Sequence, residues 1–104
     1  MTRENYSLGT LVKSIREWQA HTFPDAGPDS YYVHLLEEVG ELGDDLSKGS
    51  EIADCMMLLL GIAGVQGIDI FDELNKKFEI NKTRKWAKTE DGAYSKHVEV
   101  PANG

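Results

Sequence analysis

Hydrophobic residues recur along most of the chain at intervals of three and four, which is typical of amphipathic helices. The first such segment predicts a helix over residues 7–23, where Ser7 can serve as the N-cap. Two prolines and a glycine follow and predict a loop. A second apolar stripe predicts a helix over residues 30–47, which Asp29 or Ser30 can cap.

The third segment, residues 51–66, is apolar on almost every side. A helix of this kind is expected at the centre of a fold, where neighbouring helices cover it. Gly49 is suited to the end of the second helix and Ser50 to the start of the third, so we predict a break between them. Gly67 is expected to end the third helix.

A fourth helix is predicted over residues 70–86, with apolar residues on one face and basic residues on the other. The tail, residues 87–104, is polar. It contains an Asp-Gly turn signal at residues 91–92, and residues 94–100 could form a short strand or part of a hairpin. The chain is therefore predicted to be all-α, a four-helix bundle in a single domain over residues 1–104.

The composition narrows the range of functions. The net charge of −7 argues against a nucleic-acid partner, which normally requires a basic surface. The longest apolar stretch, residues 55–65, is too short to span a bilayer, and the N-terminus carries no apolar signal segment, so we expect a cytoplasmic protein with no membrane partner.

A chain of 104 residues buries little surface, and its apolar faces predict a homo-oligomer. Cys55, the only cysteine, is expected to be buried and inert.

Four acidic residues have matching spacings. Glu38 and Glu41 are three apart in the second predicted helix, and Glu51 and Asp54 are three apart at the start of the third. Side chains with this spacing leave one face of a helix, and a short connection favours an antiparallel hairpin in which the two pairs partly face each other. Carboxylates gathered in this way repel one another unless a cation lies among them, and ligands made of oxygen alone favour Mg²⁺ or Mn²⁺.

Two other functions remain open on these residues. Acidic pairs on helices are usually solvated, and the chain would then be a non-catalytic helical interaction module. Against this, Asp54 adjoins a segment expected to be buried, where a carboxylate needs a partner. A di-iron carboxylate bundle is the other alternative, but such sites use Glu-x-x-His, and no histidine follows Glu38 or Glu51 by three positions.

Three segments carry a resemblance to a known family. Residues 34–42 read HLLEEVGEL, residues 51–54 read EIAD before the apolar helix, and residues 77–84 read KFEINKTR. Together they resemble the MazG-like all-α nucleoside triphosphate pyrophosphohydrolases, and most of all the phage and bacterial dATP/dGTP diphosphohydrolase subgroup. The resemblance implies a homodimer or homotetramer that hydrolyses a nucleoside triphosphate, a purine deoxynucleotide in that subgroup, to the monophosphate and pyrophosphate with Mg²⁺, or Mn²⁺ in its place.

The same resemblance implies the residue roles. The metal ligands it assigns are Glu38, Glu41, Glu51 and Asp54. It implies that phosphate or base is contacted by Lys77, Asn81 and Arg84. No grouping of serine, cysteine and histidine suits covalent catalysis, so metal-activated water is the expected nucleophile.

Some neighbouring residues are further candidates. Glu37 adjoins Glu38 and is a candidate catalytic residue with Glu38 and Glu41, although it could also be a metal ligand or a surface residue. His34 lies one turn before Glu38 and could reach the substrate. The candidates for stacking on the base are Trp18, Phe23, Tyr31 and Tyr32.

Overall fold

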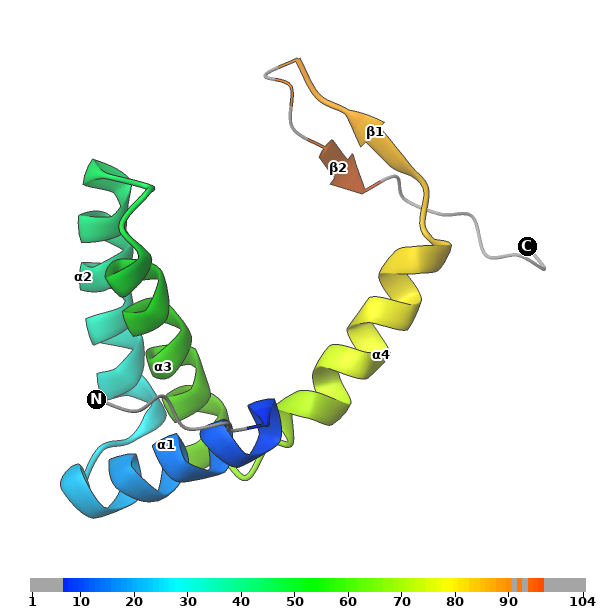
Figure 1. Cartoon of the computed structure of the whole chain (residues 1–104). Coiled ribbons are helices and arrows are strands. Elements are labelled where there is room, and N and C mark those ends of the chain that lie inside the picture. Colours follow the sequence, from blue (N-terminus) through cyan, green and yellow to red (C-terminus); the bar gives the residue numbers. More distant parts are fainter. Residues whose placement is uncertain (1–6, 91, 93, 97–104) are drawn as a thin grey trace. The chain divides into compact units, whose positions relative to one another are not determined.

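The computed structural model describes residues 7–90, 92 and 94–96, which form two compact units, each described here by itself (Figure 1). The first unit, Met1–Ile70, contains α1 (Leu8–Thr22), α2 (Pro28–Asp44) and α3 (Gly49–Val65). The second, Phe71–Gly104, contains nearly all of α4 (Ile70–Thr83) and the strands β1 (Trp86–Lys88) and β2 (Tyr94–Lys96). The expected four-helix, mostly helical fold is confirmed.

Helix α1 begins as predicted. Ser7 has an extended backbone, and its hydroxyl accepts a hydrogen bond from the Thr10 amide at 3.1 Å. The side chain thereby satisfies one of the amides that every helix leaves unpaired at its start.

None of the described helices is by itself long and apolar enough to cross a membrane; α3 and α4 reach that length and composition only as a broken pair.

Helix α2 starts earlier than predicted. Gly27 is the N-cap and Pro28 the first helical residue, so neither Asp29 nor Ser30 caps it. Proline is favoured at this position because its fixed φ angle suits the helix and its missing N–H would have no partner there. The Ser30 hydroxyl donates instead to the Gly27 carbonyl at 3.0 Å. The helix ends at Asp44 and not at residue 47.

Helix α3 also starts two residues early. Lys48 is its N-cap and Gly49 its first residue, so the predictions that Gly49 ends α2 and that Ser50 caps α3 are wrong. The turn before it is held by Asp45, whose carboxylate accepts hydrogen bonds from the Ser47 amide and hydroxyl at 3.0 and 2.6 Å. At its other end Gly67, with a φ of +70°, follows the helix as predicted.

In the first unit, α2 and α3 pack side by side as a helical hairpin, and α1 packs against α3 (Figure 1). Gly61 of α3 allows the ring of Tyr31 to approach, because a β-carbon at this position would lie 2.5 Å from the ring. Helix α3 is thus central to the unit, but it is not covered on every side. Part of its apolar surface stays about half exposed, as at Met56 and Leu59.

In the second unit, α4 stops at Thr83, and the prediction that it continues to residue 86 is wrong. Trp86 instead opens β1, which pairs antiparallel with β2 so that Trp86 lies opposite Lys96. The strand predicted over residues 94–100 is described only at its first three positions, and Asp91 lies outside the described residues. Gly92, with a φ of +88°, lies in the turn where sequence predicted one.

Candidate functional site

The α2–α3 hairpin gathers three of the predicted acidic residues. Glu38 and Glu41 from α2 and Glu51 from α3 each offer one carboxylate oxygen, and these oxygens lie within 4.8 Å of one another. The arrangement follows from local geometry, because residues three apart share a face of α2 and the short turn returns the chain beside it. We call Glu38, Glu41 and Glu51 the acidic group.

The electrostatics of the acidic group indicate that it needs a positive partner. Within the described part of the chain, Glu38 Oε2 and Glu51 Oε2 are buried and have no hydrogen-bond partner. The pKa of Glu38 is raised from 4.5 to about 7, first because its protonated carboxyl can hydrogen-bond Glu51 and Glu41, and further through burial and the charges of both neighbours. Either a shared proton or a cation relieves this repulsion. Oxygen-only ligands and unpartnered carboxylates therefore fit a hard divalent cation.

Asp54 lies one turn beyond Glu51 on α3 and does not belong to the acidic group. The expectation that Asp54 would be buried with the apolar helix is wrong, because its side chain is exposed. Its charge still acts on the buried Cys55 thiol. Burial first, and then the charges of Glu38, Glu51 and Asp54, raise the pKa of the Cys55 thiol. The predicted burial of Cys55 is confirmed.

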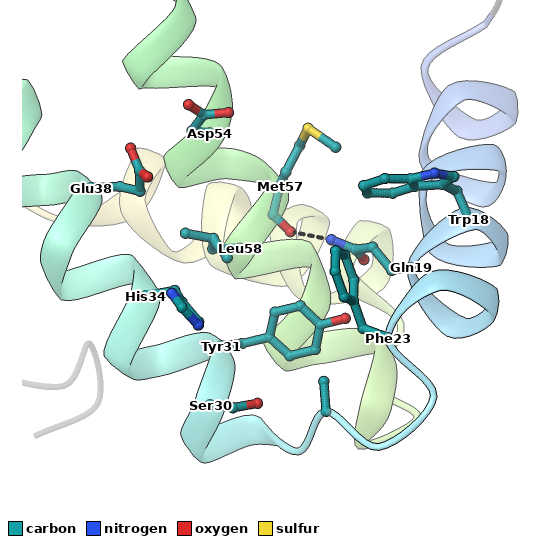
Figure 2. Close-up of a pocket in the computed structure, with 11 residues that line it drawn as sticks. Trp18, Gln19, Phe23, Ser30, Tyr31, His34, Glu38, Asp54, Met57 and Leu58 are labelled. Atoms are coloured by element: carbon teal, nitrogen blue, oxygen red, sulfur yellow. Dashed lines mark hydrogen bonds between the residues drawn. The ribbon is translucent and has the colours of Figure 1, made fainter.

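A cavity of about 390 Å³ adjoins the acidic group, a volume within the range of small-molecule sites. Glu38 belongs to both features and joins them, and Figure 2 shows Asp54 of α3 near Glu38, at the same end of the cavity. The lining comes from all three helices of the first unit and the α1–α2 loop: Trp18, Gln19, Phe23, Ala26, Ser30, Tyr31, His34, Glu38, Asp54, Met57 and Leu58. The cavity thus has a carboxylate end and an aromatic part.

The aromatic part is held together by one buried polar residue. Gln19, 2% exposed, donates from Nε2 to the Met57 carbonyl at 2.9 Å and accepts from Arg16 Nη1 at Oε1. The Gln19–Met57 hydrogen bond connects α1 with α3 next to Trp18 and Phe23. The rings of these two residues meet edge to face, with their centroids 5.4 Å apart. Sequence analysis missed Gln19, because a single glutamine on an amphipathic helix gives no signal that it is buried.

The remaining predicted residues are distributed unevenly. Trp18 and His34 line the cavity, as do Phe23 and Tyr31. Other predicted residues are not part of its lining. Glu37 is exposed and lies 3.5 Å from His34 Nδ1, outside the acidic group, and Tyr32 is exposed.

The predicted phosphate or base contacts lie in the second unit. Lys77 is exposed there, and Arg84 donates to the Asn81 amide oxygen at 3.3 Å. The acidic group belongs to the first unit, and each unit is described by itself. Their roles in binding stay predictions.

Comparison with known structures identifies the class of protein. A cyanophage S-2L MazG-like pyrophosphohydrolase, bound to dGDP and three catalytic Mn²⁺ ions per active site, matches with a TM-score of 0.75 and 31% identity. The match covers 89% of this chain and 99% of that one. The fold is therefore that of the MazG-like pyrophosphohydrolases.

Sequence comparison names the family within that class. A dATP/dGTP diphosphohydrolase of cyanophage S-2L is 34% identical over 89 residues, which are 84% of this chain and 85% of the relative. A second dATP/dGTP diphosphohydrolase, from Salmonella phage PMBT28, is 40% identical over 98 residues, and the match spans 89% of this chain but only 33% of that relative. The family model described as dATP/dGTP pyrophosphohydrolase matches residues 11–104. The chain belongs to this family of hydrolases acting on phosphoric anhydride bonds, and the predicted resemblance is confirmed.

Proposed function

We propose that this chain hydrolyses purine deoxynucleoside triphosphates, dATP and dGTP, to the monophosphate and pyrophosphate with Mg²⁺ or Mn²⁺. The observation that carries the proposal is that Glu38 is shared by an acidic group and by a cavity with aromatic walls. A nucleotide has the same two parts, an anionic phosphate chain and an apolar base. The S-2L neighbour, which binds dGDP and Mn²⁺, supports this assignment.

Glu38, Glu41 and Glu51 would hold the cations, with Asp54 as a further ligand from the cavity rim. The buried Oε2 atoms of Glu38 and Glu51 have no donor among the described residues, which favours ion binding over a structural hydrogen-bond network. Divalent cations bound there would supply an activated water and offset the charge of the phosphates. Lys77, Asn81 and Arg84 would contact the phosphates or the base, a role that rests on the family resemblance alone.

The aromatic part of the cavity would hold the nucleoside. Trp18, Phe23 and Tyr31 offer ring faces and edges, and the Gln19–Met57 hydrogen bond keeps the α1 wall next to α3. Aromatic side chains bind bases by stacking, which gives affinity without requiring one particular base. The acidic group at the other end would then receive the phosphates.

A homodimer or homotetramer is part of the proposal. The α2–α3 hairpin leaves apolar residues at helical spacing about half exposed: Tyr32, Leu36 and Val39 on α2, and Ile52, Met56 and Leu59 on α3. Exposed apolar residues that gather into a patch mark interaction sites, and the helical spacing of these residues favours such a patch. Sedimentation of the purified chain would measure the oligomeric state, and a monomer at micromolar concentration would contradict this part of the proposal.

The test is pyrophosphate release from dATP, dGTP, dCTP and dTTP, each with Mg²⁺, with Mn²⁺ and with a chelator. We expect metal-dependent release that is faster with the two purines, and its loss in Glu38→Gln. Glu17→Gln is the matched control, because Glu17 is an exposed residue of α1 outside the cavity lining. A wild-type chain that releases no pyrophosphate from any of the four would favour the interaction module instead.

A further inference from the structure

Tyr31 carries a polar group whose position in the cavity calls for a ligand. Its side chain is only 5% exposed, and it lines the cavity. Figure 2 shows the ring extending from α2 across the cavity, with the hydroxyl pointing towards the side formed by α1. The hydroxyl makes no hydrogen bond with any of the described residues. The hydroxyl oxygen is not among the fully buried unpartnered atoms of the described residues, so it faces the open space of the cavity, where a ligand can reach it.

Three of the other polar side chains of the lining already have partners. The Gln19 amide bonds Met57 and Arg16, and the Ser30 hydroxyl donates to the Gly27 carbonyl. His34 lies within 3.5 Å of the exposed Glu37. Among the buried side chains of the lining, Tyr31 thus offers the polar group that is still available to a ligand.

The position of this hydroxyl is fixed by packing. The Tyr31 ring lies against Gly61, where a β-carbon would come within 2.5 Å of two ring carbons. Tyr31 precedes Glu38 by seven residues on α2, which places the two at levels about 10 Å apart along the helix axis. That separation is close to the length of a nucleoside, so a ligand with its phosphates at the acidic group extends its base towards Tyr31.

We propose that the Tyr31 hydroxyl binds the substituent at position 6 of a purine base; this inference rests on the proposed function. A hydroxyl both donates and accepts hydrogen bonds. It donates to the O6 carbonyl oxygen of guanine and accepts from the 6-amino group of adenine, which presents the opposite polarity at the same place. One tyrosine therefore serves both purines without choosing between them.

The experiment measures binding of dGDP, dADP and inorganic pyrophosphate by calorimetry, with Mn²⁺ present, for the wild type, Tyr31→Phe and Tyr32→Phe. Phenylalanine keeps the ring that packs on Gly61 and removes only the hydroxyl. We expect Tyr31→Phe to weaken dGDP and dADP about 3- to 10-fold, the effect of one hydrogen bond, and to leave pyrophosphate affinity unchanged. Tyr32→Phe is the matched control, since Tyr32 is the next residue of α2, is 54% exposed and does not line the cavity.

A second measurement uses the wild-type protein alone. A purine deoxynucleoside diphosphate without a substituent at position 6 differs from dADP only by the amino group. We expect it to bind more weakly than dADP by the same factor, and to bind wild type and Tyr31→Phe equally.

The outcomes separate this inference from the function on which it rests. Equal affinity of wild type and Tyr31→Phe for dGDP overturns the Tyr31 assignment and leaves the proposed function standing. So does a parallel loss of pyrophosphate affinity, which would mark a purely structural role for the hydroxyl. A wild type that binds neither dGDP nor pyrophosphate overturns both.

Discussion

The acidic group and the aromatic part of the cavity differ in how the chain builds them. The acidic group needs only α2, α3 and a short turn, because helical spacing aligns its members. The aromatic part needs α1 as well, and α1 is held by contacts between distant residues. These contacts are the Gln19–Met57 hydrogen bond and the passage of the Arg16 side chain over Gly64, where a β-carbon would clash.

The two parts also differ in energetic character. Glu38 and Glu51 bury oxygens without partners, and the raised pKa of Glu38 reflects repulsion within the acidic group. The aromatic part has satisfied its buried amide at Gln19 and buries most of Tyr31. Single substitutions in the acidic group should therefore leave folding intact. Substitutions in the aromatic part should affect both folding and the binding of nucleotide.

The largest effect is expected from Glu51→Gln. Changes outside the ligand shell of a metal already cost 10- to 100-fold, so the loss of a ligand should reduce pyrophosphate release by at least about 100-fold. The metal-free protein should unfold at the same or a higher temperature, because one buried negative charge is gone. Pyrophosphate release and thermal unfolding with a chelator are the measurements. Activity within a few-fold of wild type would remove Glu51 from the site.

The next largest effect is expected from Gly61→Ala, which tests the aromatic part. The added β-carbon would lie 2.5 Å from the Tyr31 ring. Overpacking typically costs about 1–3 kcal/mol and alanine returns about 1 kcal/mol of helix propensity, so we expect a net loss of up to about 2 kcal/mol. Unfolding in urea measures the change.

The control for Gly61→Ala is Gly40→Ala, since Gly40 lies inside α2 with open space around a built β-carbon. It should raise the free energy of unfolding by up to about 1 kcal/mol. Equal effects at Gly40 and Gly61 would mean that the Tyr31 ring does not pack closely on α3.

The same division explains what the sequence could predict. Four helices and the acidic residues follow from periodicity and spacing, which are local properties. The exposure of Asp54 depends on the rotation of α3 against α2, and the burial of Gln19 on the docking of α1; no short pattern encodes either. The early end of α4 has a similar cause, since the spacing in the sequence predicts a helix to residue 86, whereas Trp86 pairs in a strand with Lys96 ten residues later.

A smaller effect is expected from Trp18→Ala. Stacking of a base on an aromatic side chain is worth about 1–3 kcal/mol, and Trp18 is 49% exposed, so we expect the lower part of that range, about a 10-fold rise in KM for dATP or dGTP. The kcat value and Mn²⁺ affinity should change little. Leu8→Ala, an exposed apolar residue of α1 outside the cavity lining, is the control. A loss confined to kcat, with KM unchanged, would contradict a role of Trp18 in binding the base.

The smallest effect is expected in the pH dependence of the free energy of unfolding of the metal-free protein. The folded chain retains the Glu38 proton up to a pKa of about 7, whereas an unfolded chain releases it near 4.5. Between these values the folded state binds more protons, so the free energy of unfolding should fall as the pH rises and level off above about 7. Glu38→Gln should remove this slope, and saturating Mn²⁺ should reverse it, because ligands bind metal in their deprotonated form. Urea unfolding with a chelator across this range is the measurement. An unchanged slope in Glu38→Gln would show that the proton is held elsewhere, and the contrast between a repulsive acidic group and an uncharged aromatic part would no longer hold.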